Sequence, residues 1–292
     1  MRFKLASFAA GAVLASMPAV ASATGDPVVL APSSPWNVDF APTKCRLART
    51  FGEGENRHIL FFEQFYPDER AGLTVAGPEL SRFRSRARTT LRFFEGHDGH
   101  RTEPFAGDME IYGKAVIYAN VDLAEEAGEE DDPDATGVAQ LDTEFGKRIE
   151  FVSLEQRGRE VHFQTGPLDE AFAVLNTCTQ DMISDWGLDV EQHLAATRRP
   201  QWNNELAIAR RLQAQYPSDA LRQGEQAILR MRVIVGVDGK VEKCQIDAAT
   251  TNDLDSPACR EMEKAEFEPA LDSEGQPFRS YYAASIIYRV GR

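Results

Sequence analysis

The chain has 292 residues, of which 32 are basic and 46 are acidic, so its formal net charge is −14. An acidic surface repels a phosphate backbone, which excludes nucleic acid as an expected partner. The acidity is uneven, because residues 203–292 hold 12 basic and 14 acidic side chains whereas residues 24–202 hold 18 and 32. This change in composition favours two domains.

The first residues have the pattern of an export signal. Arg2 and Lys4 precede an apolar run of 13 residues from Leu5 to Met17, and the small residues at 21–23 offer a cleavage site. The run is shorter than the about 18 to 20 apolar residues of a membrane-spanning helix. We therefore expect a Sec-type signal peptide over residues 1–23 that is cut between Ala23 and Thr24, and a periplasmic mature chain without a membrane span. An uncleaved N-terminal anchor is the alternative.

Residues 24–195 are expected to form an acidic, β-rich domain that begins with an extended arm. Runs rich in β-branched and aromatic residues predict an antiparallel sheet with strands at 58–66, 72–77, 109–123, 148–156 and 159–165. The segment QRGR at 156–159 reads as a hairpin turn. A helix follows, with Pro167 in its first turn, an apolar stripe that includes Cys178, and Gly187 after its end.

The polar, basic segment 196–202 predicts a linker to a second domain at 203–292. There the sequence predicts a helix at 203–213, a hairpin, a short helix near 256–265 and a last strand at 278–290, so the fold class is α+β. In the hairpin, alternation predicts one buried face and one solvated face that carries Arg230 and Arg232. A two-residue turn at Asp238-Gly239 sets Val233 opposite Cys244 and Met231 opposite Ile246.

The four cysteines lie in a chain bound for an oxidising compartment, so disulfides are expected. Three pairings are possible. The division into two domains favours Cys45 with Cys178 and Cys244 with Cys259.

No motif of known catalytic or metal-binding spacing occurs in the sequence. Ser153 and His162 would face each other across the QRGR turn, but neither a third group nor an oxyanion donor accompanies them. His97 and His100 in the segment HDGH lack a second ligand cluster. We therefore predict no catalytic residue, no metal and no cofactor, and we expect a protein that is not an enzyme.

Four arginines, Arg82, Arg84, Arg86 and Arg88, occupy alternate positions. In a strand they would line one face and form an anion-binding stripe, which an envelope glycan or lipid could use. Intramolecular ion pairs, or a charged sheet edge that resists aggregation, are the alternative interpretations.

Five fragments of the second domain occur in a characteristic order: QYPSDAL at 215–221, ILRMRVIVGVDGKVEKCQI at 228–246, LDSPACREM at 254–262, AEFEPALDSEGQPF at 265–278 and YYAASIIYRV at 281–290. This set resembles the C-terminal domain of TonB-type energy transducers. In that family a Tyr-Pro step, here Tyr216-Pro217, precedes the first strand, and a Phe-x-Pro-Ala segment, here Phe267 to Ala270, precedes the last. A typical transducer has a membrane helix and a Pro-rich spacer, where this chain has a cleavable signal and an acidic domain.

The resemblance implies a small α+β domain that lends a sheet edge to a peptide of a protein partner, such as an outer-membrane transporter. Alternation in the last strand independently predicts that one side of it packs on the two helices. The residues that should point away and form the partner-binding edge strand are Arg279, Tyr281, Ala283, Ser285, Ile287 and Arg289. An edge closed by the N-terminal domain or by a second copy is the alternative.

The rival functions are a hydrolase-like periplasmic enzyme with its site in the N-terminal domain, and an envelope glycan or lipid binder.

Overall fold

A computed structural model describes residues 26–84, 87–124, 134–215, 222, 226–248 and 257–289. The predicted signal peptide with its cleavage site at Ala23 and Thr24 lies outside these residues, as do Arg86 and the Tyr216-Pro217 step. The fold is α+β, as predicted, and is rich in strands. No helix within the described ranges combines the length and the apolarity needed to cross a bilayer.

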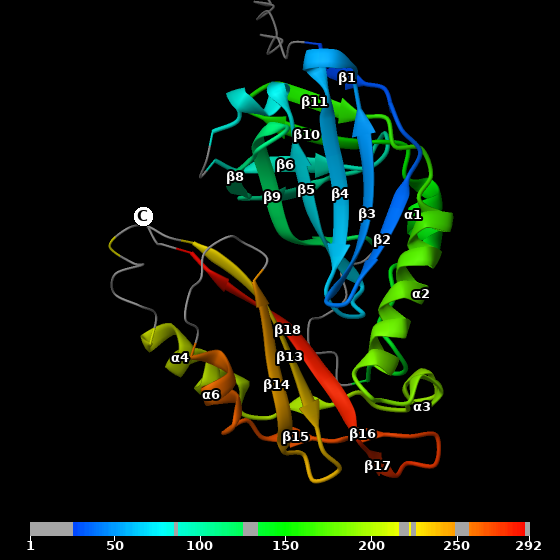
Figure 1. Ribbon diagram of the computed structural model, residues 1–292, viewed down its shortest axis with the longest axis vertical. Helices are drawn as coiled ribbons and strands as arrows, with labels where there is room; N and C mark the ends of the chain where they lie inside the picture. The colour runs from blue at the N-terminus through cyan, green and yellow to red at the C-terminus, as the bar shows by residue number, and fades with distance from the viewer. Residues whose placement is uncertain are drawn as a thin grey trace, which may run out of the picture.

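The N-terminal region consists of two packed sheets (Figure 1). The six-stranded sheet has the order β2-β3-β4-β5-β9-β8, and the five-stranded sheet has the order β1-β11-β10-β6-β7. The first sheet comprises β2 (Asn37–Ala41), β3 (Lys44–Phe51), β4 (His58–Gln64), β5 (Arg70–Ala76), β8 (Phe105–Met109) and β9 (Gly113–Asp122). The second comprises β1 (Val28–Leu30), β6 (Thr89–Arg92), β7 (His100–Thr102), β10 (Val152–Gln156) and β11 (Arg159–Phe163).

Two details of these sheets differ from the sequence-based expectation. The predicted strand at 109–123 is split by a turn at residues 110–112 between β8 and β9. The predicted extended arm contains β1, which pairs in parallel with β11. Two 3-10 helices, η1 (Gly54–Asn56) and η2 (Pro78–Arg82), lie in the connections.

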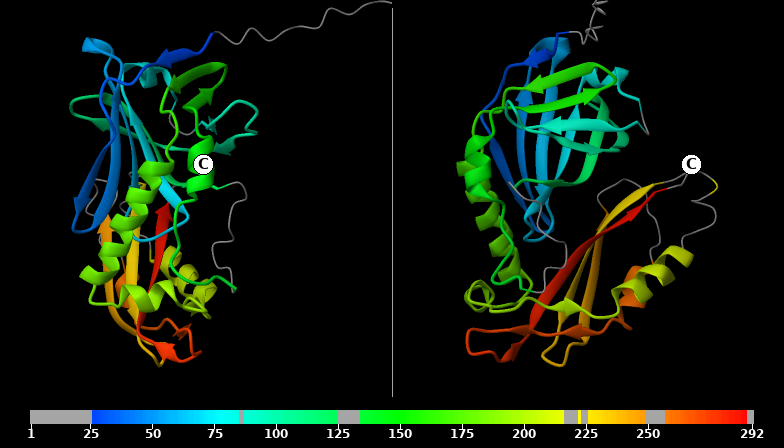
Figure 2. Two further views of the ribbon diagram at one scale, coloured as in Figure 1. Left: turned by 90° about the vertical axis from the view of Figure 1, so that its right-hand side faces the viewer. Right: turned by 180° about the vertical axis from the view of Figure 1, so that it is seen from behind.

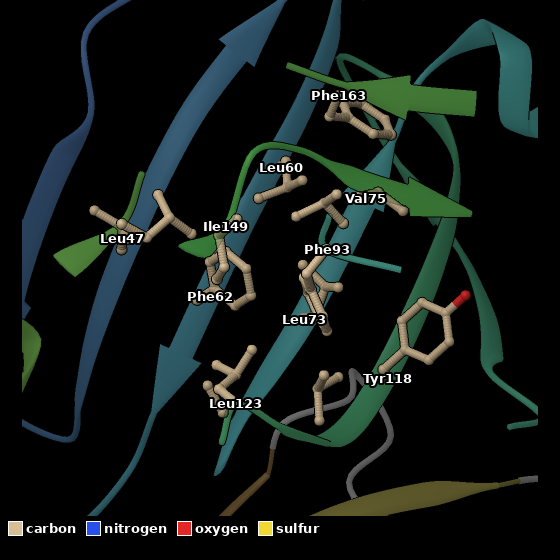
Figure 3. Packing of buried hydrophobic residues seen from close by; sticks show 14 of the residues in the cluster. Leu47, Leu60, Phe62, Leu73, Val75, Phe93, Tyr118, Leu123, Ile149 and Phe163 are labelled. Atoms are coloured by element: carbon tan, nitrogen blue, oxygen red, sulfur yellow. The ribbon is translucent and has the colours of Figure 1, made fainter. Parts of the chain in front are cut away.

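The apolar side chains of both sheets meet in one core (Figure 3). Leu60, Phe62 and Leu73 from the six-stranded sheet pack with Phe93 and Phe163 from the other side, and all five are fully buried. Removing each such side chain from water stabilises the fold by about 1.5–3 kcal/mol. The runs of β-branched and aromatic residues that predicted the strands therefore supply Leu60, Phe62, Leu73 and Phe163 to this core.

Three helices follow or interrupt the strands: α1 (Thr143–Arg148), α2 (Asp169–Asp185) and α3 (Val190–Leu194). Helix α2 confirms the predicted apolar stripe, since Phe172, Leu175 and Cys178 are buried against the core. A disulfide joins Cys178 to Cys45 of β3, as predicted. The helix ends before Gly187, which adopts a φ of 76°, a conformation that glycine enters without strain.

The C-terminal region is a three-stranded sheet with helices on one face (Figure 1). The sheet order is β14-β13-β18, and a second predicted disulfide joins Cys244 of β14 to Cys259 of the following helix. The helices are α4 (Glu205–Ala214) and α6 (Ala258–Met262). The strands are β12 (Gln201–Trp202), β13 (Ala227–Val235), β14 (Val241–Ala248), β15 (Phe267–Glu268), β16 (Ala270–Leu271), β17 (Pro277–Phe278) and β18 (Ser280–Tyr288).

The hairpin of β13 and β14 has the predicted register, with Val233 opposite Cys244. The register shifts at Ile234 and Val235, so the connection is longer than a two-residue turn. Gly239 of the turn lies against the backbone of Phe267, because a Cβ atom built there would come within 2.0 Å of the Phe267 carbonyl oxygen. The Phe267 amide in turn donates to the Gly239 carbonyl at 3.1 Å. Glycine in the turn thus allows β15 to pack against the hairpin.

The segment predicted as a linker is part of the C-terminal fold. Gln201 and Trp202 form β12, which pairs with β15, and Arg198 forms a bridge with Leu271. Trp202 stacks on Phe267, with ring centroids 5.8 Å apart. The division of the chain into domains at 196–202 stays a prediction.

The two disulfides should differ in their effect on stability. In the chain-entropy model, the bridge that spans 133 residues stabilises by about 5 kcal/mol and the bridge that spans 15 by about 3 kcal/mol. We expect C45A/C178A to lower the free energy of unfolding by about 2 kcal/mol more than C244A/C259A does. Denaturant titration without reductant measures both values, and an equal or smaller loss for C45A/C178A would contradict the prediction.

Candidate functional site

The outer edge of β18 has no strand beside it among the described residues. Within the described part of the chain β18 pairs with β13 alone, and no strand adjoins its other side. From Ser280 to Tyr288 the strand has no charged side chain. The opposite edge of the sheet, β14, carries Glu242, Lys243 and Asp247. Charged side chains on an edge oppose pairing with another strand, so β18 is the edge that suits an incoming strand.

The two sides of β18 have different neighbours. Tyr282, Ala284 and Ile286 pack with the helices, as predicted for that side. The six predicted edge-strand residues point away from the helices, and most of them contact the N-terminal region. Tyr281 packs on Trp186 and His193, and the Ser285 hydroxyl forms a hydrogen bond with that of Tyr66. Arg289 donates to the Glu103 carbonyl, and Arg279 donates to Glu242 and to the Gly187 carbonyl. Ala283 lines a cavity, and Ile287 is 40% exposed.

Arg230 of β13 corrects the expectation of a solvated face. It is only 6% exposed, because the N-terminal region covers this face of the sheet. Its guanidinium donates to the Asn120 side chain at 2.7 Å, to the Ala119 carbonyl and to the Ser285 hydroxyl. Strand β13 is therefore buried on both faces, and the N-terminal region lies on the side of the sheet away from α4 and α6 (Figure 2).

The surroundings of Arg230 compensate its charge without a direct ion pair among the described residues. The guanidinium lies 5.3 Å from the centroid of the Phe65 ring. Gly72 leaves room for it, since a Cβ atom there would come within 3.1 Å of Nη2. Burial raises the pKa of Asp68, and the positive charges of Arg70 and Arg230 oppose this rise. Burial also raises the pKa of Tyr66, whose hydroxyl lies 2.8 Å from that of Ser285.

A cavity of about 490 Å³ lies beside the first half of the β18 edge. This volume is within the range of about 300–1,000 Å³ that is typical of ligand pockets. Its walls come from the β4–β5 turn, the end of β9, helix α3, the segment before α4, and β18 itself. Representative lining residues are Asp68, Asp122, His193, Trp202, Tyr281 and Ala283.

Two polar atoms of the cavity wall have no hydrogen-bond partner among the described residues. One is Nε2 of His193, a residue that is 5% exposed, and the other is Oγ of Ser280, which is 1% exposed. His193 Nδ1 lies 2.6 Å from the Asp189 carbonyl, which only accepts, so Nδ1 carries the proton and Nε2 is an acceptor. Burial lowers the pKa of His193, which keeps the ring neutral at pH 7.

The predicted arginine stripe does not form one strand in the described residues. Arg82 ends η2, and Arg84 and Arg88 lie outside the strands. The buried side chain of Gln156 binds the backbone of Arg84 at both its amide and its carbonyl. The geometry that would align the arginines on one face is therefore missing here.

The residues weighed for catalysis or metal binding lie apart from the β18 edge. Ser153 is opposite His162, as the hairpin predicted, but its hydroxyl makes no hydrogen bond to any described residue. His162 Nε2 instead lies 2.9 Å from Glu160. His97 and His100 have ring centroids 5.3 Å apart, and the described ranges contain no group of three metal-ligating side chains.

Sequence reasoning missed two kinds of residue in this site. His193 lies in a short helix without any motif, and only folding brings it to the cavity. Arg230 was placed on a solvated face, although Ile228 and Ile234 occupy the same face of β13. Two isoleucines beside an arginine were a signal that this face is covered.

We expect Arg230 to hold the two regions together more strongly than Arg232, which lies on the same face of β13. Arg232 donates to Gln245 within the sheet and stacks 4.2 Å from the Trp186 ring centroid. R230M should cost about 2–4 kcal/mol, because it removes charge-assisted hydrogen bonds and leaves buried acceptors unpaired. R232M should cost less. Denaturant titration and hydrogen exchange at residues 119–120 measure the difference, and equal losses would contradict this role.

Comparison with known proteins identifies only the C-terminal part of the chain. The family model described as the Gram-negative bacterial TonB protein C-terminal matches residues 213–290, which is 78 of 292 residues. No curated protein matches the sequence. The matched segment includes β13, β14, α6 and the whole of β18, as the motifs predicted. Residues 213–290 are therefore similar to the Gram-negative bacterial TonB protein C-terminal.

Proposed function

We propose that the protein binds an extended segment of a partner protein in the periplasm by adding it as a strand to the outer edge of β18. The observation that carries the proposal is that this edge is free of strand partners among the described residues and is uncharged from Ser280 to Tyr288. The match to the TonB protein C-terminal over 213–290 supports a protein partner. The resemblance makes an outer-membrane transporter the expected partner.

The chemistry of the edge suits a backbone ligand. Along an antiparallel edge strand, alternate residues direct their N–H and C=O groups outward, and a bound strand satisfies these groups. Such hydrogen bonds depend little on the sequence of the ligand. Selectivity must come from side-chain pockets, and the cavity beside Tyr281 and Ala283 is in the right place to supply one.

The N-terminal region supports this edge from one face of the sheet. Tyr66 bonds Ser285, Arg230 bonds both Ser285 and Asn120, and Arg289 lies 4.3 Å from the Phe105 ring centroid. These contacts fix β18 before a ligand arrives. A strand that is ordered in advance loses less entropy on binding, which favours affinity.

The first test is a titration of the complete mature chain with peptides from the N-terminal segments of outer-membrane transporters. We expect amide chemical-shift changes in NMR spectra to concentrate at 278–289, with few at 241–248 of the opposite edge. Strand addition forms main-chain hydrogen bonds at β18, so its amides should respond most. Changes confined to α6 or β14, or no response at millimolar peptide, would defeat the proposal.

A second test uses N-methylation of single residues in a peptide that binds. In strand addition only every second residue of the ligand directs its N–H toward β18. Methylation should therefore weaken binding by about tenfold at alternate positions, since each loses about one hydrogen bond of 0.5–1.5 kcal/mol and meets a steric clash. The intervening positions are the matched controls. An effect without this two-residue period would contradict binding as a strand.

A further inference from the structure

The cavity beside β18 has an excess of acidic side chains. The described residues that line it include the carboxylates of Asp68, Glu69, Asp122 and Glu205 and the guanidinium groups of Arg70 and Arg199. Asp68 pairs with Arg70 and Glu69 pairs with Arg199, each at 3.3 Å. Asp122 forms no ion pair within the described ranges and is half-buried at the end of β9. The cavity therefore favours a positive charge.

The two polar atoms without partners require a ligand that donates hydrogen bonds. His193 Nε2 is an acceptor, because Nδ1 carries the proton, and the Ser280 hydroxyl accepts as well as donates. Both residues are at least nine-tenths buried and line the cavity. A buried acceptor that stays unpaired costs about 1–3 kcal/mol, so a ligand with N–H groups gains by reaching them.

Aromatic side chains form much of the remaining wall. Trp202, Tyr281 and Tyr282 line the cavity, and Tyr281 stacks on His193 with ring centroids 5.6 Å apart. The face of an aromatic ring attracts a cation, and its apolar area covers the aliphatic part of a long side chain. Lysine and arginine combine such an aliphatic stem with N–H donors that carry a positive charge.

We infer that the cavity binds the ammonium or guanidinium group of a lysine or arginine side chain carried by the segment that pairs with β18. This inference rests on the proposed function. A paired strand would lie about 4.8 Å from β18, so its side chains on one face would enter beside Ala283. Asp122 supplies the opposite charge, while His193 and Ser280 accept hydrogen bonds.

The test uses host peptides of nine residues, the length of β18, that differ only at the central position. That position is lysine, arginine, norleucine or glutamate, and calorimetry with the complete mature chain measures each affinity. We expect the lysine and arginine peptides to bind about tenfold more tightly than the norleucine peptide, and the glutamate peptide to bind most weakly. Norleucine has the aliphatic stem without the charge, so it isolates the cationic group.

Two charge-removing variants localise the effect. D122N should weaken the lysine peptide about 5- to 10-fold and leave the norleucine peptide within about twofold. D39N removes the same charge from the exposed strand β2, away from the cavity, and should change neither. If the lysine and norleucine peptides bind equally well and both still change the NMR shifts of β18 amides, the inference is overturned. The proposed function is then unaffected. Equal effects of D122N and D39N would also overturn it.

If no host peptide binds, strand addition fails and the cavity is tested by itself. Butylammonium chloride is then the probe, with butanol as the uncharged control. The cation site would be upheld without the strand if butylammonium changes the NMR chemical shifts of His193 and Ser280 and butanol does not. The D122N variant should abolish these changes. The absence of such shifts would overturn the inference.

Discussion

The arrangement of the whole molecule depends on the burial of β13 on both faces. Helices α4 and α6 cover one face, and the N-terminal region covers the other, where Arg230 has to be satisfied. A buried guanidinium is stable only if most of its N–H groups find acceptors. Asn120 and the Ala119 carbonyl of β9 supply these acceptors. A strand of the C-terminal region therefore depends on hydrogen-bond acceptors of the N-terminal region.

The same contact determines which surfaces remain available. A sheet of three strands has two edges and two faces, and here both faces of the central strand are covered. The edge of β14 is protected by its charges, which leaves the uncharged edge of β18. Natural proteins rarely leave such an edge open without a function, because it invites aggregation. Its position beside a cavity between the two regions limits access to ligands that fit there.

The Cys45–Cys178 disulfide contributes to the site from a distance. It fixes α2 to β3, and α2 leads through Gly187 to the short helix α3 that carries His193. The ring of His193 packs between Phe278 and Tyr281, so the covalent link in the N-terminal core helps to define one wall of the cavity. This is a physical route by which a bridge near the start of the chain affects the edge of its last strand.

The C-terminal region was largely predictable because its information is local. Alternation and the Asp-Gly turn placed Val233 opposite Cys244, and the ordered motifs predicted the similarity of residues 213–290 to the TonB protein C-terminal. The apolar stripe of α2 was predicted from helical spacing, and both disulfide pairings were predicted from the expected export signal and the expected division into two domains. Short strands such as β6, β7 and β12 were missed, since two to four residues carry too little periodicity to show a pattern.

What the sequence by itself determined was the α+β class, the disulfide pairing, the hairpin register and which side chains of β18 face the helices. Only the tertiary structure decided what the other side of that sheet contacts. Alternation marks a polar face, but it does not say whether water or another part of the chain covers it. The partners of Arg230 lie about 110 residues away, at Ala119 and Asn120, and the cavity gathers residues from Tyr66 to Ala283. Such long-range contacts arise from the packing of whole elements and leave no local pattern.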